Sequence, residues 1–146
     1  MFITIEELHS IIYEYQLQQI TQQNQDIAFM AIATAEQEVK SYLTPNAQKH
    51  WQDGRLRYDV ALIFSKKGIN RNPLLVQQVK TVAVWYLCQL SNPDIIYENI
   101  KERYDRVIDY LKQVALGSVT LDLPLLTTNK NTKPFRFASR KKFNHE

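Results

Sequence analysis

The order of hydrophobic and polar positions predicts four helices joined by polar segments. The first begins at Thr4, because a threonine followed three residues later by Glu7 forms a capping box that satisfies free amides at a helix start. Ile3 and Leu8 occupy the two staple positions around that cap. The pattern extends this helix to about Gln19. Its apolar stripe consists of Leu8, Ile11, Ile12 and Tyr15.

The second predicted helix begins at Asp26, a residue type that caps helices well. It ends soon after Leu43, because Pro45 disfavours helical backbone in the residue before it. Its apolar residues recur at alternating spacings of four and three, which places them on one face. That face consists of Ala28, Ile32, Ala35, Val39 and Tyr42.

Residues 44–72 interrupt the helical pattern with an irregular segment. Asp59 is a candidate cap for a short helix through Phe64, with Gly68 just beyond its end. A strand over Leu56–Phe64 is the alternative, although its apolar residues do not alternate as those of a half-buried strand do. The pattern favours the short helix and leaves the strand open.

Two long helices are predicted in the second half of the body. Asn72 and Pro73 open the first of them as cap and first helical residue. The second extends from about Ile95 to Leu116 and ends at Gly117. A short connection favours an antiparallel hairpin. The core-facing residues are Val76, Val79, Ala83, Tyr86, Leu87 and Leu90 in one helix, and Ile96, Ile100, Tyr104, Val107, Leu111 and Val114 in the other.

Beyond Gly117 the apolar residues no longer follow helical spacing, which predicts an extended arm. Thr127–Pro134 is polar and is expected to be flexible. The sequence therefore predicts an all-α fold, a small bundle of about four helices with an irregular 44–72 loop and an extended C-terminal arm. We expect a helical domain at 1–126 and a flexible basic tail at 127–146.

Charge divides the chain into a mildly acidic body and a basic tail. The net charge is +3, and residues 128–146 carry six Lys or Arg against one acid, so the body has a net charge of −2. The single cysteine cannot form an internal disulfide. The beginning of the chain lacks a signal-peptide pattern, and no uninterrupted apolar stretch is long enough for a membrane span. We therefore expect a cytoplasmic protein with no membrane partner.

The residues that usually carry chemistry are scattered. His9, His50 and His145 lie far apart. His9 has Glu6 three residues before it and His50 has Asp53 three residues after it, but neither pair has a second histidine or a cysteine at zinc-site spacing. Cys88 lies beside an apolar stripe and is most simply a small core residue. There is no phosphate-binding glycine loop and no dinucleotide fingerprint. The sequence predicts no catalytic, metal or cofactor site, and hence no enzyme.

Two segments are candidates for binding partners. The tail interleaves phenylalanines with basic side chains, which suits either ordering on a protein partner or stacking on nucleic-acid bases. The irregular loop is a possible subunit interface. A solvated tail and a solvated loop are the simpler alternatives. The tail candidates are Phe135, Arg136, Phe137, Arg140, Lys141 and Phe143, and the loop candidates are Trp51, Arg55, Arg57, Lys66, Lys67 and Arg71.

Short stretches along nearly the whole chain match a known family pattern. They are Phe2–Leu8; Ala35–Leu43; Tyr58-Asp59, Ile63-Phe64, Gly68 and Arg71–Leu74; Glu102–Asp105, Leu111-Lys112, Val114-Ala115, Gly117 and Leu121–Pro124; and the end from Phe135 to His145. In order and spacing they resemble the Mu-like prophage head–tail connector family, in a variant from phages of gut bacteria. Lys80-Thr81 and the stretch Pro45–Gly54 depart from that pattern.

The resemblance implies a structural role in the virion neck. It implies a ring of copies under the portal protein, which presents a surface to tail-side neck proteins. It further implies assembly in the host bacterial cytoplasm and then residence in the virion neck. The alternative is a nucleic-acid-binding helical module that uses its basic aromatic tail. Because the basic charge is concentrated in the tail and the loop, and not on a helix face, direct nucleic-acid binding is less favoured.

Overall fold

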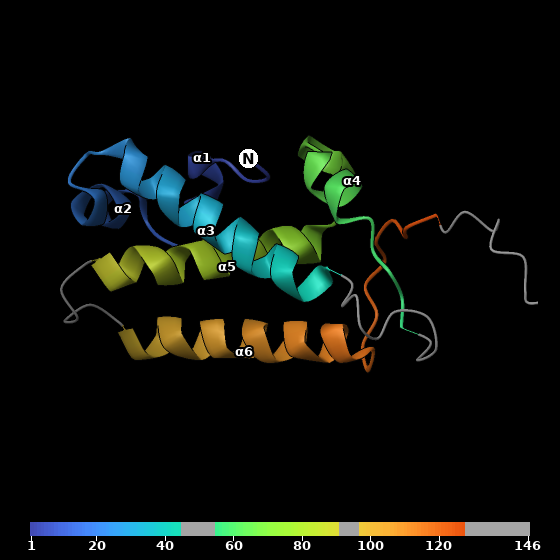
Figure 1. Ribbon diagram of the computed structural model, residues 1–146. Coiled ribbons are helices and arrows are strands. Elements are labelled where there is room, and N and C mark those ends of the chain that lie inside the picture. Colours follow the sequence, from blue (N-terminus) through green and yellow to red (C-terminus); the bar gives the residue numbers. More distant parts are fainter. Residues whose placement is uncertain (45–54, 91–96, 128–146) are drawn as a thin grey trace, which may run out of the picture.

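The computed structural model describes residues 1–44, 55–90 and 97–127, and these residues confirm the predicted all-α fold (Figure 1). Three long helices, α3, α5 and α6, form the body, and α5 and α6 lie side by side and antiparallel. The short helices α2 and α4 lie at opposite ends of this body (Figure 1). The helices are α1 (Ile5–Leu8), α2 (Glu14–Thr21), α3 (Gln25–Leu43), α4 (Val60–Ser65), the 3-10 helix η1 (Gly68–Asn70), α5 (Pro73–Leu90) and α6 (Tyr97–Leu116).

The central helix is α5, which contacts both α3 and α6. Its start is as predicted, because the Asn72 side chain accepts a hydrogen bond from the backbone N–H of Leu75 at 3.0 Å. Apolar side chains are buried on several sides of this helix, which is typical of a helix enclosed by others. They are Leu75, Val79, Val82, Ala83, Val84, Trp85, Leu87 and Cys88, while Val76 and Tyr86 are partly buried.

The predicted stripe of α6 is also confirmed over its described part. Leu111 and Val114 are buried, and Ile100, Tyr104 and Val107 pack partly buried against the core. The helix ends as expected, because Gly117 has a φ of +79°, a left-handed conformation that glycine adopts without strain.

The prediction of a single first helix from Thr4 to Gln19 is wrong. The capping box exists, with the Thr4 N–H donating to the Glu7 carboxylate at 2.8 Å, but α1 ends at Leu8 and α2 begins only at Glu14. The break turns the second half, so that Leu17 is buried, whereas Tyr15 is 64% exposed and not part of the core. The fold therefore buries Leu17 in place of Tyr15, the residue that would continue the predicted apolar stripe.

The predicted buried face of the second helix is confirmed, but its predicted N-cap residue is wrong. Asn24, and not Asp26, is the cap, and its side chain accepts from the Asp26 N–H at 3.0 Å. Asp26 lies in the first turn, where a carboxylate interacts favourably with the helix dipole. The predicted residues Ala28, Ile32, Ala35 and Val39 are buried, and Tyr42 is partly buried.

In the irregular segment the short helix is confirmed and the strand is wrong. The Asp59 side chain accepts from the Leu62 N–H at 2.9 Å and caps α4. The residues before α4 lie against the extended arm that follows α6. The Asp59 N–H donates to the Pro124 carbonyl at 2.9 Å, and the Leu126 N–H donates to the Arg57 carbonyl at 2.7 Å.

Two further expectations relate to the chain as a whole. None of the helices in the described ranges is long and apolar enough to cross a membrane. The division into a domain at 1–126 and a tail at 127–146 stays a prediction, because residues 128–146 lie outside the described part of the chain.

Candidate functional site

One polar cluster joins all three long helices. Glu38 of α3 accepts hydrogen bonds from the hydroxyl of Tyr104 of α6 at 2.8 Å and from that of Tyr86 of α5 at 3.0 Å. The ring of Tyr104 also stacks on Trp85, with centroids 4.9 Å apart. We call Glu38, Tyr86 and Tyr104 the tyrosine clasp. Because its members come from three helices, the tyrosine clasp fixes how these helices lie relative to one another.

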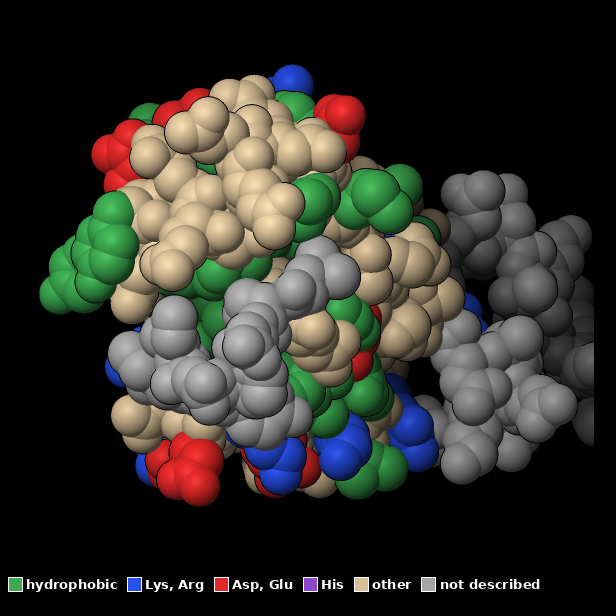
Figure 2. All heavy atoms as spheres, turned by 90° about the vertical axis from the view of Figure 1, so that its left-hand side faces the viewer, with side chains coloured by type: hydrophobic (Ala, Val, Ile, Leu, Met, Phe, Trp, Pro, Cys, Tyr) green, Lys and Arg blue, Asp and Glu red, His purple; other side chains and the backbone are tan. Residues whose placement is uncertain are grey.

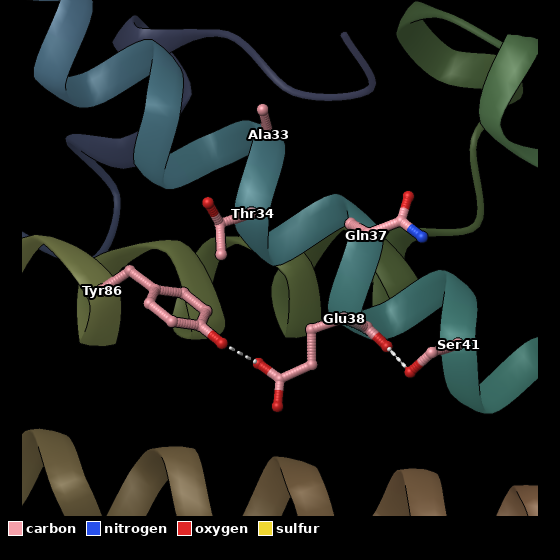
Figure 3. A pocket seen from close by; sticks show the side chains of 6 residues that line it. All are labelled: Ala33, Thr34, Gln37, Glu38, Ser41 and Tyr86. Atoms are coloured by element: carbon pink, nitrogen blue, oxygen red, sulfur yellow. Dashed lines mark hydrogen bonds between the residues drawn. The ribbon is translucent and has the colours of Figure 1, made fainter.

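A shallow, open groove of about 590 Å³ runs beside the tyrosine clasp (Figure 3). The close view shows Glu38 and Tyr86 pointing toward each other, while the Ser41 hydroxyl donates to the Glu38 backbone carbonyl. Each of the two Glu38 carboxylate oxygens accepts a hydrogen bond from one tyrosine hydroxyl. The residues that line the groove are Ala33, Thr34, Gln37, Glu38, Ser41 and Tyr86.

The surroundings of both tyrosine hydroxyls keep them protonated. Burial is the largest cause, and the hydrogen bond to Glu38 and its negative charge act in the same direction. Together they raise the pKa of Tyr86 to about 12, and they raise the pKa of Tyr104 above its usual value as well. Both hydroxyls therefore remain hydrogen-bond donors at neutral pH, which suits a structural connection between helices.

We predict that Glu38→Gln lowers the pKa of both tyrosines, because it removes the negative charge that opposes their ionisation. The values should stay above about 10, the usual value, since burial remains. An absorbance titration of tyrosinate measures the shift, with Tyr86→Phe and Tyr104→Phe assigning each step and Glu102→Gln on the exposed face of α6 as the control. Titration curves that coincide in Glu38→Gln and the unmodified chain would contradict the assigned role of Glu38.

The raised pKa values of the two tyrosines determine how stabilisation by the tyrosine clasp depends on pH. A raised folded-state pKa contributes stability that is fully present below the unfolded value of about 10. That contribution is lost as the pH rises from there towards the folded value of Tyr86, about 12. Tyr104, whose pKa is also raised, shifts in the same direction.

A second cluster holds the beginning of the chain on the body. The Arg71 guanidinium forms a two-pronged ion pair with Glu7, with nitrogen–oxygen distances of 2.5 and 3.0 Å, and it donates to the Phe2 carbonyl at 2.6 Å. The side chains of Arg71 and Glu7 are 11% and 27% exposed. The hydrogen bond from Arg71 lowers the pKa of Glu7, and Glu7 raises the pKa of Arg71.

Phe2 extends this cluster to α3 and α4. Its backbone N–H donates to the Glu36 carboxylate, and its ring packs on Phe64 with centroids 4.7 Å apart. Lys40 lies 3.9 Å from Glu36 and 4.8 Å from the centre of the Phe64 ring. We call Phe2, Glu7, Glu36, Phe64 and Arg71 the N-terminal clasp. It connects the first residues to α3, to α4 and to the turn before α5.

The structure places several of the loop candidates in contacts within their own chain. Arg71 belongs to the N-terminal clasp. Arg55 donates to the Ala115 carbonyl at 2.9 Å, at the end of α6, and its side chain lies close to Gly117. Arg57 and Lys66 are partly exposed, and Lys67 is exposed. The remaining candidates, Trp51 of the loop and all six tail residues, lie outside the described part of the chain.

Two of the residues considered for chemistry, His9 and Cys88, lie in the described part of the chain, whereas His50 and His145 lie outside it. His9 is exposed, and Cys88 is buried as predicted, with burial raising the pKa of its thiol. Within the described ranges, no group of three His, Cys, Asp or Glu side chains is placed to hold a metal ion. Sequence reasoning missed both clasps, because Glu38 follows the pattern of a solvated helix residue and Glu7 already has a local role in the capping box.

Comparison with known proteins identifies a family. The model of the family described as Bacteriophage Mu, Gp36 matches residues 2–139. No curated protein and no solved structure matches the chain. The match covers α1 to α6, including both clasps, and extends into the basic tail. The chain therefore belongs to the Bacteriophage Mu Gp36 family and is a Mu-like phage protein.

Proposed function

We propose that the chain is a structural head–tail connector subunit of a tailed phage or prophage and has no enzymatic activity. The observation that carries this proposal is the family match over residues 2–139, which suggests a phage structural or morphogenesis protein. The narrower role rests on the resemblance of Phe2–Leu8 and Leu121–Pro124, among other stretches, to the connector pattern. In this role, copies form a ring under the portal and contact tail-side neck proteins.

The construction of the body supports this role. Subunits of a closed ring must meet at a fixed angle, so each subunit needs a body that does not bend. The tyrosine clasp holds α3, α5 and α6 together, and the N-terminal clasp adds α1 and α4. The open groove beside Glu38 offers no enclosed chamber for a substrate. These features favour a rigid adaptor.

The charge pattern supports protein partners more than nucleic acid. On α6 three exposed basic residues pair with acids: Lys101 with Asp105 at 3.7 Å, Arg106 with Glu102 at 2.5 Å, and Lys112 with Asp109 at 3.3 Å. A helix that reads DNA presents a basic face instead. The proposed sites of action are the host bacterial cytoplasm during assembly and then the virion neck, with no membrane partner.

The proposal is tested by expressing the chain with the portal protein of its own phage. Native mass measurement and electron microscopy should show a ring of copies bound to the portal. In the phage, a stop codon early in the gene should yield heads filled with DNA but without tails. Normal tailed particles from that mutant, or no association with the portal, would overturn the connector role.

The tail is the second part of this test. Removing residues 128–146 should leave the melting temperature of the subunit nearly unchanged, because a segment with three phenylalanines and a charge of +5 cannot build a core of its own. It should weaken attachment to the neck. A matched variant that replaces Arg136, Arg140 and Lys141 by glutamine separates the charge from the aromatic anchors. A truncated chain that completes infectious particles as well as the full chain would contradict a role for the tail.

A further inference from the structure

Charge and exposed apolar surface both differ between the two ends of the body. Residues 13–30, at one end, contain two acidic residues and no Lys or Arg, whereas residues 60–70, at the other end, contain two lysines and no acid. In the fold, α2 and the beginning of α3 lie at one end of α5, and α4 with η1 lies at the other (Figure 1). The 18 residues of α5 span about 27 Å, so the two surfaces are well separated.

The first surface is acidic and aromatic. Tyr13 and Tyr15 are 70% and 64% exposed, yet their rings stack with centroids 5.8 Å apart. Stacking restricts both rings before any partner binds, which reduces the entropy lost on docking. Figure 2 looks onto this end, where hydrophobic side chains protrude at the left margin below acidic ones. We call Tyr13, Glu14, Tyr15, Asp26, Phe29 and Met30 the acidic end; all six are exposed.

The second surface is basic and aliphatic. Ile69, in η1, is fully exposed, and Leu62 and Leu74 are each nearly half exposed. Lys66 and Lys67 lie between them in sequence. The Arg71 side chain donates to the Gly68 carbonyl at 3.0 Å, and this contact links η1 to the N-terminal clasp. We call Leu62, Lys66, Lys67, Ile69 and Leu74 the basic end.

We propose that the acidic end of one copy docks on the basic end of the next copy. This inference rests on the proposed ring and names the surfaces that form it. Two different, opposite surfaces are what a head-to-tail contact requires, and such contacts close into a ring when the rotation per copy allows it. Exposed aromatic rings meet exposed aliphatic side chains, while opposite charges around them attract and set the orientation. Like ends repel, which disfavours a two-fold dimer.

Charge reversal tests the pairing of the two ends on the portal-bound protein. The variant Glu14→Lys/Asp26→Lys should assemble at least about tenfold less well than the unmodified chain, and so should Lys66→Glu/Lys67→Glu. An equal mixture of the two variants should recover assembly, because each reversed end then meets a complementary end on the other variant. The matched control, Asp105→Lys/Asp109→Lys on the exposed face of α6, should assemble normally.

Further variants keep the test decisive. Melting curves show whether the reversed chains fold, and Glu14→Gln/Asp26→Asn and Ile69→Ser weaken the same surfaces with smaller changes. The inference is overturned if a ring forms and all these variants join it normally, or if the mixture of reversed chains recovers nothing. The inference is also overturned if only the acidic-end variants weaken assembly and removal of the basic tail weakens it equally. In that case the acidic end would bind the tail and not the basic end of the next copy. Absence of any ring with the unmodified chain would instead overturn the proposed function.

Discussion

Replacing Leu111 by alanine should lower the free energy of unfolding by about 2–5 kcal/mol. Leu111 is fully buried on α6, a helix that packs against both α3 and α5, so the lost methyl groups leave a cavity that three helices cannot easily close. Denaturant unfolding measures the change, provided that the slope of the unfolding free energy against denaturant concentration is the same in both chains.

The same helix supplies a matched control. Leu116 is 62% exposed, and Leu116→Ala should change the free energy of unfolding by no more than about 0.5 kcal/mol. Equal losses for the two substitutions would contradict the packing of α6, because they would show that Leu111 is no more buried than Leu116.

Arg71→Ala should be the second most destabilising change, with a loss of about 1.5–3 kcal/mol. The substitution leaves the Glu7 carboxylate and the Phe2 carbonyl without their strongest donor. This expected loss is smaller than the loss for a fully buried ion pair, because Glu7 is 27% exposed and water can replace part of the interaction. The control is Arg106→Ala, whose ion pair with Glu102 is just as short but 77% exposed on the arginine side. It should cost no more than about 0.5 kcal/mol.

The pH dependence separates this ion pair from simple packing. Arg71 lowers the pKa of Glu7, so the pair stabilises the fold above the unfolded pKa of about 4.3. This stabilisation is lost as the pH falls through the lowered folded-state pKa. The difference in stability between the unmodified chain and Arg71→Ala should therefore shrink in acid. A difference that is constant from neutral pH to acid would show that packing of the arginine stem, and not its charge, stabilises the N-terminal clasp.

Local interactions explain why the sequence by itself determined most of the helix boundaries. Thr4 with Glu7, Asp59 and Asn72 each bond to backbone groups within three residues, and Gly117 adopts its left-handed conformation at the end of its own helix. These signals need no partner from elsewhere in the chain. The buried faces of α3 and α6 were predictable for a related reason. Apolar residues at helical spacing lie on one face of the helix, and that face is buried against whatever the helix packs on.

Tertiary structure decided the break between α1 and α2 and the placing of the polar side chains. Whether Tyr15 or Leu17 faces inward depends on α3 and α5, against which α2 packs, so the local stripe could not reveal it. Both clasps join residues distant in sequence: Glu38 lies 48 and 66 positions from its two tyrosines, and Arg71 lies 64 positions from Glu7. A charged residue on a helix follows the same sequence pattern whether water or a distant side chain satisfies it. Only the packing of the helices brings these partners within hydrogen-bond distance.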